Sequence, residues 1–564
     1  MQKTIVIWGA GRIGRGFVAD LFAPAGYRLV LVDQSAALVA QLRELGRYTV
    51  VWASEGQAPQ HRVISAFTAL PTTDTAAVAQ AIAAADLVAV AVFPRDLATV
   101  AQQLAPGLVQ RFRSHPDAPL DIILCTNLAH AGPQLELPLL ASLPLELRPW
   151  AETHVGIVES LVIRMVVEPP AEALARDPLV VWTNGYASLP VDRKAFRGPL
   201  PEVPGLRLVD DMRAEELRKL YTYNTFHAAL AYFGALLGCT TIVECFTDPE
   251  VCAAADGALR ESSQVLQAAL GFDSADMEHW LAAVRAQTNN PALGDTVQRY
   301  GADPRRKLRR KDRLLGPLLL ARDHHISAPY LTRAVAAALL YDDPGDPGVA
   351  AIQQQIGEQG LDLAVRELCE LGAAEGDVVD AIHAAYDLLV GEAIVRRASQ
   401  LAFDYERRYH GCGQCTLAAI LDSLEGVAPC AADAVFEAAT GLAGGLGLAG
   451  DAPCGALMGA SLAFGLLYPR HRDHFAGDRE NKYRSYAMVQ QLRERYIETY
   501  GGTTCWDVHR RIFGRSFDLR DPVEREAFAA AGAHEDKCTA VVATAVRWAM
   551  EIILEQRRLD QQRQ

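Results

Sequence analysis

The first pattern along the chain is an apolar run, then a glycine-rich turn, then a helical repeat of apolar positions. Thr4 to Trp8 reads TIVIW, and GAGRIG from Gly9 to Gly14 leads into a helical pattern that extends to about Phe22. A second apolar run, Arg28 to Val32, ends in Asp33. Strand, glycine turn, helix and strand in this order predict the βαβ unit that opens a parallel sheet.

Later apolar runs extend this sheet. Ala85 to Phe93 and Leu120 to Cys125 are continuous, as expected for strands buried on both faces. Open α/β sheets bind ligands at the carboxyl ends of their strands, so Phe93 and Asn127 are expected at the edge of a cofactor site, unless they only shape loops. The segment from Trp150 to Pro169 alternates like a strand and is expected to lead the chain across the cleft.

The stretch from Asp210 to Gly238 has apolar residues three and four apart and is expected to be one helix. Lys219, Asn224 and His227 fall at about 0°, 140° and 80° around it, within one broad arc. Eight residues of straight helix rise about 12 Å, so these side chains reach one atom only if the helix bends or the ligand is long. They are either a base with two groups that hold oxygens, or a half-buried lysine beside a structural histidine.

Helical periodicity continues in alanine-rich segments from about residue 330 to residue 400, where the composition changes. Six of the eleven cysteines lie beyond that point. The sequence therefore predicts an α/β Rossmann domain at residues 1–190, a mostly helical substrate domain at 191–395 and a helical cysteine-containing domain at 400–564.

The acidic composition limits the expected partners. A net charge of -14 and a pI near 5.5 argue against bulk nucleic-acid binding and leave room for a local basic patch. The longest apolar stretch, Gly441 to Tyr468, is interrupted by Asp451 and Pro453, so no membrane span is expected. A strand-like start and eleven cysteines without an export signal favour a cytoplasmic protein. The oligomeric state is left open.

The glycine turn has the spacing of a dinucleotide-binding motif. Gly9 permits the tight turn, Gly11 lets the backbone approach a pyrophosphate, and Gly14 lets helix and strand pack closely. Asp33 follows Gly14 by nineteen residues, where a carboxylate accepts the ribose hydroxyls and repels a 2′-phosphate. The sequence therefore predicts NAD rather than NADP. The expected binding residues are Gly9, Gly11, Arg12, Ile13, Gly14, Asp33, Phe93 and Asn127.

Five motifs before residue 390 occur in the order of a known family. They are GAGRIGRGF, Cys125-Thr126-Asn127, HVGIVES with Arg164, KLYTYNTFH, and PRRKLRRKDRLLGP from Pro304. With them the chain resembles the mannitol-1-phosphate 5-dehydrogenases, a family of long-chain polyol dehydrogenases. The resemblance implies a Rossmann domain, a helical second domain, no catalytic metal, and interconversion of mannitol 1-phosphate and fructose 6-phosphate. It also implies that Lys219 is the base and that Asn224 and His227 act at the reacting carbon.

The run from Arg305 to Arg313 is basic in seven of nine positions, which is unusual in an acidic chain. The guanidinium group of arginine can donate two parallel hydrogen bonds to phosphate oxygens. The expected phosphate ligands are therefore Arg306, Lys307 and Arg313, which fall on the family motif. The residues from Arg309 to Lys311 are expected at the surface. The alternatives are a solvated charged face, an unphosphorylated polyol or uronate substrate, or a redox or metal sensor that binds NAD without turnover.

The cysteines after residue 400 resemble those of a second family. HGCGQCTLAAIL around Cys415 and PCGALMG from Pro453 to Gly459 are similar to two motifs of a family of redox-active proteins. Cys505 and Cys538 fit the last two cysteines of that family. The resemblance covers about 150 residues, and it implies a C-terminal redox domain.

Three readings of these cysteines stay open. Cys412 and Cys415 form a CxxC pair, which can ligate a metal or cycle between dithiol and disulfide. A site assembled from Cys415, Cys454, Cys505 and Cys538 could hold zinc or an iron–sulfur cluster, or exchange disulfides. Redox chemistry is favoured because no second compact ligand pair accompanies CxxC. The third reading is inert packing thiols, and Cys430 is expected to be one. The glycines at 444, 445 and 447 predict a close backbone approach to metal, thiol or helix.

Overall fold

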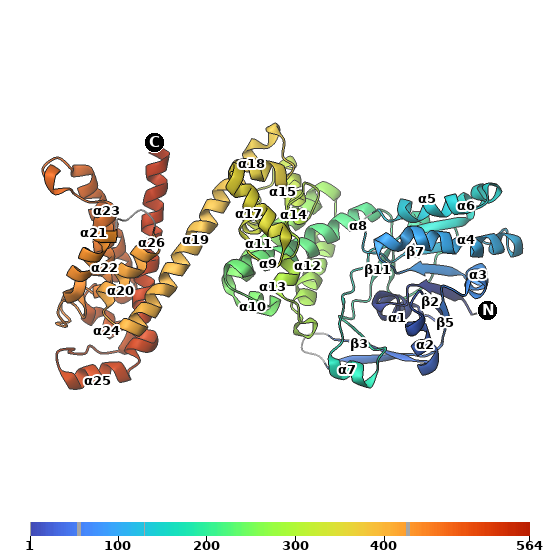
Figure 1. Ribbon diagram of the computed structural model, residues 1–564, viewed down its shortest axis with the longest axis horizontal. Coiled ribbons are helices and arrows are strands. Elements are labelled where there is room, and N and C mark those ends of the chain that lie inside the picture. Colours follow the sequence, from blue (N-terminus) through green and yellow to red (C-terminus); the bar gives the residue numbers. More distant parts are fainter. Residues whose placement is uncertain (1, 54–57, 129, 425–428, 564) are drawn as a thin grey trace. The chain divides into compact units, whose positions relative to one another are not determined.

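The structure is a computed structural model that describes residues 2–53, 58–128, 130–424 and 429–563. The chain divides into two compact units, Met1–His383 and Ala384–Gln564 (Figure 1). The long helix α19 (Gly376–Tyr409) runs through the point of division. The first unit contains both a parallel sheet and the helices that follow it in the chain.

A parallel sheet of six strands forms the N-terminal part of the first unit. Its order is β5 (Phe67–Pro71), β2 (Arg28–Asp33), β1 (Thr4–Trp8), β6 (Leu87–Val90), β7 (Leu120–Leu124) and β8 (Val155–Glu159). Counted along the chain, these strands follow the order 3-2-1-4-5-6 of a doubly wound fold, with the change of direction between β1 and β6. Ligands bind at that change of direction.

Alternate residues of each strand supply two cores, one on each face of the sheet. Ile5 and Ile7 of β1 pack with residues of α1 (Ala19–Phe22) and α2 (Ala36–Leu45). Val6 and Trp8 pack on the other face with α3 (Thr75–Ala84) and α4 (Leu97–Ser114) (Figure 1). Burial on both faces is the reason that these strands are continuous apolar runs in the sequence.

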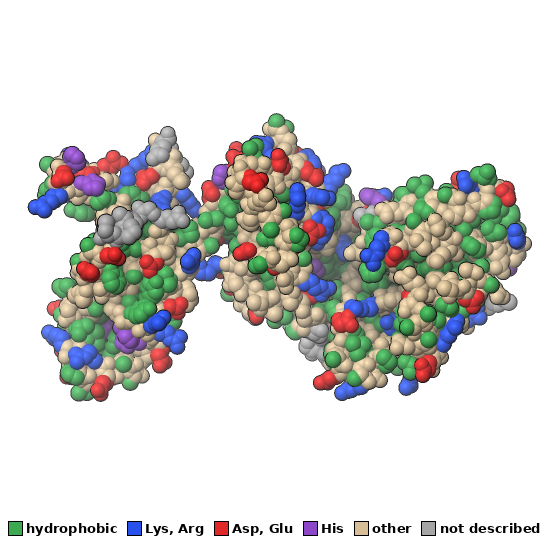
Figure 2. All heavy atoms as spheres, viewed as in Figure 1, with side chains coloured by type: hydrophobic (Ala, Val, Ile, Leu, Met, Phe, Trp, Pro, Cys, Tyr) green, Lys and Arg blue, Asp and Glu red, His purple; other side chains and the backbone are tan. Residues whose placement is uncertain are grey.

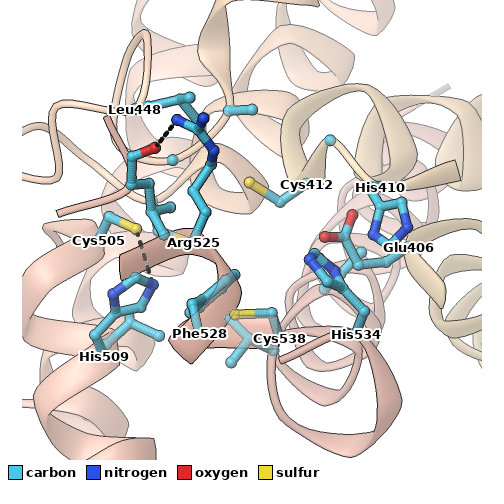
Figure 3. A pocket seen from close by; sticks show the side chains of 18 residues that line it. Glu406, His410, Cys412, Leu448, Cys505, His509, Arg525, Phe528, His534 and Cys538 are labelled. Atoms are coloured by element: carbon cyan, nitrogen blue, oxygen red, sulfur yellow. Dashed lines mark hydrogen bonds between the residues drawn. The ribbon is translucent and has the colours of Figure 1, made fainter. Parts of the chain in front are cut away.

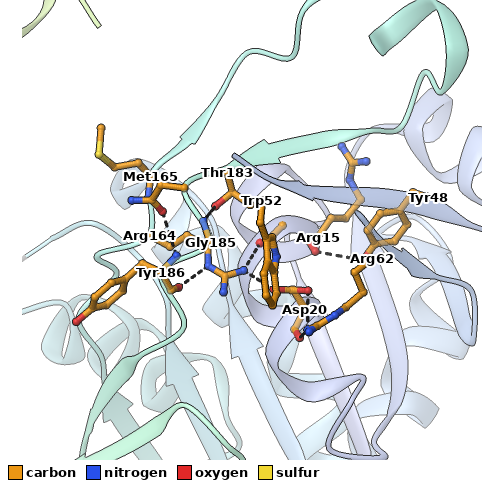
Figure 4. Close-up of polar contacts among 12 residues, drawn as sticks. Arg15, Asp20, Tyr48, Trp52, Arg62, Arg164, Met165, Thr183, Gly185 and Tyr186 are labelled. Atoms are coloured by element: carbon orange, nitrogen blue, oxygen red, sulfur yellow. Dashed lines mark hydrogen bonds and ion pairs between the residues drawn. The ribbon is translucent and has the colours of Figure 1, made fainter. Parts of the chain in front are cut away.

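A buried ion pair ties the first helical segment to the chain after β8 (Figure 4). Arg164 donates to the Asp20 carboxylate at 2.5 Å, to the Gly16 carbonyl at 2.8 Å and to the Tyr186 carbonyl at 2.6 Å. Both side chains of the pair are almost completely buried, and the guanidinium lies 4.6 Å from the centroid of the Phe17 ring. Arg164, singled out by its motif, therefore holds the fold together at this point.

The segment expected to alternate as a strand folds in three parts. Arg148–His154 is helix α6, Val155–Glu159 is β8, and Val166–Val167 is the short strand β9. The prediction was wrong for the helical part, where Pro149 occupies the first turn, a position that does not need a backbone N–H. Strand β9 joins a second sheet with β3 (Tyr48–Trp52), β4 (Gln60–Ile64) and β10 (Val181–Thr183).

A two-stranded parallel sheet, β11 (Leu189–Asp192) and β12 (Leu206–Val209), precedes the helices of the first unit. Helices α9 (Thr225–Leu236), α11 (Pro249–Leu270) and α16 (Pro329–Leu340) pack against one another. Phe226 and Leu230 of α9 and Leu331 of α16 are completely buried. Alanine is frequent at these contacts, which lets the helix axes approach closely.

The second unit is built from helices. They include α20 (Cys412–Asp422), α22 (Gly455–Leu467), α23 (Arg479–Tyr500), α24 (Cys505–Phe513), α25 (Pro522–Ala530) and α26 (Cys538–Arg563). Leu417, Phe464, Leu492 and Ile553 are among the residues of its core. Cys430 lies in α21 (Pro429–Ala438), but its side chain is outside the described residues, so its expected role as a packing thiol stays a prediction.

Acidic and basic side chains are interspersed on the face of the protein drawn in Figure 2. Among the helices of the described residues, none has both the length and the apolar content that crossing a membrane requires.

Candidate functional site

The helix expected between Asp210 and Gly238 is interrupted at its functional residues. Helix α8 (Met212–Lys219) begins after Asp211, whose carboxylate accepts the Ala214 N–H at 3.0 Å. Leu220–Asn224 then forms a π-helical turn before α9 continues. Residues five apart face the same side of a π-turn, whereas on an α-helix they point about 140° apart. The turn therefore lets Lys219 and Asn224 line the same cavity.

The Lys219 side chain is held by two oxygen acceptors. Its Nζ lies 3.2 Å from Asn127 Oδ1 and 2.7 Å from the Val162 carbonyl oxygen. Burial, and after it the positive charge of Arg313, lower the pKa of Lys219 to about 8. A lysine in this range can act as a general base near neutral pH.

The cavity around Lys219 has a volume of about 800 Å³. It lies between the loop after β7, which contributes Asn127, and the helical segment that carries Lys219 and Asn224. This volume lies within the usual range for small-molecule sites.

His227 is placed apart from this cavity and is not among its described lining residues. Its Nε2 lies 3.1 Å from Thr288 Oγ1, and its ring stacks on the Tyr300 ring with the centroids 4.2 Å apart. Burial lowers the pKa of His227 to about 3, so the imidazole is neutral at physiological pH. The structure thus brings Lys219 and Asn224 together and leaves His227 beside them in a packed environment.

Arg306 and Arg313 line the Lys219 cavity, together with Lys311. Asp312 partly neutralises them, because its carboxylate lies 3.3 Å from Arg306 Nη1 and 2.8 Å from Arg313 Nε. Lys311 is exposed, as expected, and is also part of the lining. Arg310 does point away, and its guanidinium pairs with Glu375 at 2.5 Å.

Lys307 differs from the expectation of a phosphate ligand. Its side chain is buried, its ammonium donates to the Tyr300 carbonyl, and its Nζ lies 5.6 Å from the centroid of the Tyr232 ring. Burial, and then the charge of Arg313, lower its pKa to about 7. An amine that already has a buried partner is not offered to the cavity.

The glycine turn after β1 lines another cavity, of about 300 Å³, where the sheet changes direction. Gly9 has a φ of 94°, and a Cβ there would lie 2.4 Å from the Ala91 carbonyl oxygen. A Cβ on Gly14 would lie 1.9 Å from the Gly9 carbonyl oxygen, whereas a Cβ on Gly11 would meet nothing within 4 Å. The turn therefore requires glycine at two positions for packing and leaves space at the third, which fits the pyrophosphate of a dinucleotide.

The other expected cofactor residues divide into three groups. Asp33 and Phe93 line the glycine-turn cavity, and Asp33 Oδ1 accepts the Ser35 N–H at 2.8 Å. Arg12 is exposed and pairs with Glu168, while Ile13 packs against the core, and neither is among the described lining residues of this cavity. Asn127 lies in the Lys219 cavity and accepts a hydrogen bond from the lysine, and its expected place at the edge of the cofactor site stays a prediction.

Two further side chains of the Lys219 cavity were missed in the sequence. Glu216 lines it, and burial, followed by the negative charge of Glu159, raises its pKa to about 7. Arg213 also lines it and lies 3.4 Å from the Glu216 carboxylate. Glu216 lies three residues before Lys219 along α8, and Arg213 lies three residues before Glu216. Residues three apart are neighbours on a helix surface, so this spacing was the available signal.

A third cavity, of about 190 Å³, lies inside the second unit (Figure 3). Its lining includes Cys412, Cys454, Cys505 and Cys538. Cys415, expected as a member of this set, instead directs its thiol to the His410 carbonyl oxygen at 3.2 Å. The CxxC motif is therefore split between two environments. In the described part of the chain, no three His, Cys, Asp or Glu side chains are close enough to hold one metal ion.

Comparison with known families matches both units. The mannitol dehydrogenase Rossmann domain matches residues 3–205, and the mannitol dehydrogenase C-terminal domain matches residues 211–371. Residues 3–371 thus belong to the mannitol dehydrogenase family, a class of polyol oxidoreductases. Residues 410–552 match the family described as "Putative redox-active protein (C_GCAxxG_C_C)".

Solved structures share the fold of the first unit. A D-sorbitol dehydrogenase in substrate-free form has a TM-score of 0.59 and 15% identity, covering 70% of this chain and 94% of its own. The mannitol 2-dehydrogenase of Pseudomonas fluorescens, in a ternary complex with NAD and D-mannitol, has a TM-score of 0.52 and 17% identity, covering 70% and 93%. The predicted NAD-binding Rossmann domain and helical second domain are confirmed.

Proposed function

We propose that the first unit is an NAD-dependent dehydrogenase that interconverts a hexitol phosphate and a ketose phosphate, with mannitol 1-phosphate and fructose 6-phosphate as the expected pair. The observation that carries this proposal is the shared cavity of Lys219 and Asn224 with Arg306, Lys311 and Arg313. A base and an amide beside a cluster of fixed positive charges suit an open-chain polyol with a phosphate at one end.

NAD, bound at the glycine turn, supplies the electron acceptor for oxidation of a secondary alcohol. Gly9, Gly11 and Gly14 shape the turn that holds its pyrophosphate, and the Asp33 carboxylate accepts hydrogen bonds from the ribose hydroxyls. This arrangement is supported by the free space at Gly11 and by the position of Asp33 in the same cavity.

Lys219 takes the hydroxyl proton of the substrate in its neutral form, oriented by Asn127 Oδ1 and the Val162 carbonyl. The Asn224 amide donates to the substrate oxygen from the same face of the π-turn. Glu216, with a pKa of about 7, can exchange protons near Lys219. His227, neutral and hydrogen-bonded to Thr288, has no proton-transfer step in this arrangement.

Substrate specificity is tested by turnover. NADH-dependent reduction of fructose 6-phosphate but not of fructose supports the proposal. Reduction of fructose or of a keto-uronate alone would assign an unphosphorylated substrate. NADH binding without turnover on any of these ketoses would assign a sensor of NAD status.

The basic cluster is tested by a matched pair of substitutions. Arg306→Gln removes a charge that lines the cavity, whereas Arg310→Gln removes the same charge from a side chain that pairs with Glu375. A hydrogen bond to a charged group contributes about 1.5–3 kcal/mol, so Arg306→Gln should raise the KM for fructose 6-phosphate roughly 10- to 150-fold. If both substitutions changed the KM for fructose 6-phosphate equally, Arg306 would not be a phosphate ligand.

A further inference from the structure

The thiol-lined cavity of the second unit (Figure 3) has cysteines that lie at or beside helix starts. Cys412 is the first residue of α20, Cys505 is the first residue of α24, and Cys454 directly precedes α22. The first turn of a helix carries a partial positive charge of about half a unit, from N–H groups without helical partners. Helix ends of this kind favour negative charge on a nearby sulfur. They oppose the rise in pKa that the contact with Cys454 and burial cause at Cys412, and that burial causes at Cys505.

Two of these thiols, those of Cys412 and Cys454, contact each other. Gly455 permits the contact, because a Cβ there would lie 2.3 Å from Cys412 Sγ. Gly459, one turn later, packs as closely: its Cβ would lie 2.1 Å from the Gly413 carbonyl oxygen. Both glycines of the Cys-Gly-Ala-x-x-Gly motif therefore bring the first turn of α22 onto the first turn of α20.

Hydrogen-bond donors surround this pair. The Tyr496 hydroxyl donates to Cys454 Sγ at 3.9 Å, and the Gly444 backbone N–H donates to Cys412. Gly444 and Gly445 have φ values of 62° and 70°, so the glycine turn before α22 folds in a left-handed conformation beside the thiols. The close backbone approach expected from these glycines is thus to thiols. Donors to sulfur stabilise the thiolate over the thiol.

Buried polar atoms without partners point to an occupant. In the described residues, neither Glu406 Oε2 nor His509 Nδ1 has a hydrogen-bond partner, although these side chains are only 3% and 2% exposed. Both residues line the cavity. A buried polar atom left unpaired costs about 1–3 kcal/mol, so a cavity with such atoms is suited to a ligand that supplies the missing bonds.

We propose that Cys412 and Cys454 form a redox-active dithiol that exchanges with a low-molecular-weight disulfide in this cavity. Cys454, as the thiolate, attacks one sulfur of the disulfide; its S–S bond breaks and one half leaves as a thiolate. Cys412 then loses its proton and attacks the Cys454 sulfur, which releases the second half. Two protein thiols are oxidised to one disulfide, the small disulfide is reduced to two thiols, and these take up the two protons.

The neighbouring cysteines take no part in this exchange. Cys505 has a partner outside the pair, because its Sγ lies 3.4 Å from His509 Nε2. The thiol of Cys415 donates a hydrogen bond to the His410 carbonyl oxygen. Cys454 is the attacking sulfur because it accepts a hydrogen bond from the Tyr496 hydroxyl and directly precedes α22, and Cys412 beside it is the resolving thiol.

The test treats the reduced full-length protein with bis(2-hydroxyethyl) disulfide, followed by alkylation and peptide mass spectrometry. We expect loss of two thiols per chain and a Cys412–Cys454 cross-link that a dithiol reverses. Cys412→Ser should leave a stable hydroxyethyl mixed disulfide on Cys454, because the second attack is missing. Cys454→Ser should abolish both products. Cys415→Ser is the matched control and should behave as the unchanged protein does.

The cross-link in the unchanged protein needs no substitution, so the test does not depend on whether a variant folds. A cross-link between Cys412 and Cys415, or between Cys505 and Cys538, would overturn the assignment of the pair. Stoichiometric zinc or iron in anaerobically purified protein, lost in Cys454→Ser, would replace exchange by a metal site. If all the thiols were alkylated and none reacted with the disulfide, the cysteines would have only a packing role.

Discussion

Gly11→Ala and Gly14→Ala should separate cofactor binding from folding, because the same added methyl group meets different surroundings in one turn. At Gly14 the new carbon would lie 1.9 Å from the Gly9 carbonyl oxygen and 3.3 Å from Ile7 Cγ2. The first contact is about 1 Å closer than real Cβ atoms approach, and the obstacle is backbone. At Gly11 nothing lies within 4 Å.

The magnitudes follow from these distances. Overpacking costs about 1–3 kcal/mol, and at roughly 2–4 °C per kcal/mol in a large domain Gly14→Ala should lower the Tm of the first unit by about 2–12 °C. Gly11→Ala should change its stability by less than about 0.5 kcal/mol. Its methyl group would occupy the space for the pyrophosphate, so a loss of about 1–3 kcal/mol should weaken NADH binding roughly 5- to 150-fold.

Calorimetry of the NADH-free protein gives the Tm, and titration of NADH fluorescence gives the Kd. The expected outcome is a stable Gly11→Ala protein that binds NADH weakly. The reasoning would be refuted if Gly11→Ala lowered the Tm as far as Gly14→Ala does and kept normal NADH affinity. The glycine turn would then contribute to packing and would have no role in cofactor binding.

Four other predictions concern the first unit. Lys219→Ala should lower turnover by roughly two to four orders of magnitude with the NADH Kd unchanged, and near-normal turnover would remove Lys219 as the base. In the unchanged enzyme, alcohol oxidation should rise as the pH increases through about 8, because only the neutral amine accepts a proton; a pH-independent rate would contradict this. Asp33→Ala should weaken discrimination against NADP in paired kinetic assays, and an unchanged NAD to NADP ratio would place Asp33 away from the ribose. Asp20→Ala should cost about 3–5 kcal/mol in urea unfolding, since it leaves the buried Arg164 charge without its partner, and a loss below 1 kcal/mol would contradict that account.

The parts of the fold that could be predicted from sequence are those under local constraint. Strand β1 and its glycine turn are set by short-range sterics, and each of Gly9 and Gly14 has a backbone contact that excludes a side chain. The family matches confirm the Rossmann and helical domains that these patterns indicated. The strand expected at Trp150 failed because apolar alternation there competed with a proline suited to a helix start.

Side-chain direction was beyond sequence reasoning where tertiary packing decides it. Lys307 and Lys311 lie in one basic run, yet the first is buried under Tyr232 and the second lines the cavity. Cys412 and Cys415 lie in one motif and face different surroundings. The two members of each pair are the same residue type in the same short stretch of sequence. Only the packing of neighbouring helices distinguishes them.

The π-turn at Leu220–Asn224 accommodates one residue more than an α-helix would place between Lys219 and His227. Five residues of a π-turn turn the chain about as far as four residues of an α-helix, so the face of α9 that packs Phe226 and Leu230 keeps its direction relative to α8. Deleting one residue there would let the segment close as a continuous α-helix, with Lys219 and Asn224 four residues apart and still on one face. Adding a residue to an already continuous α-helix would instead rotate α9 by about 100° and disturb the lysine face and the helical core together.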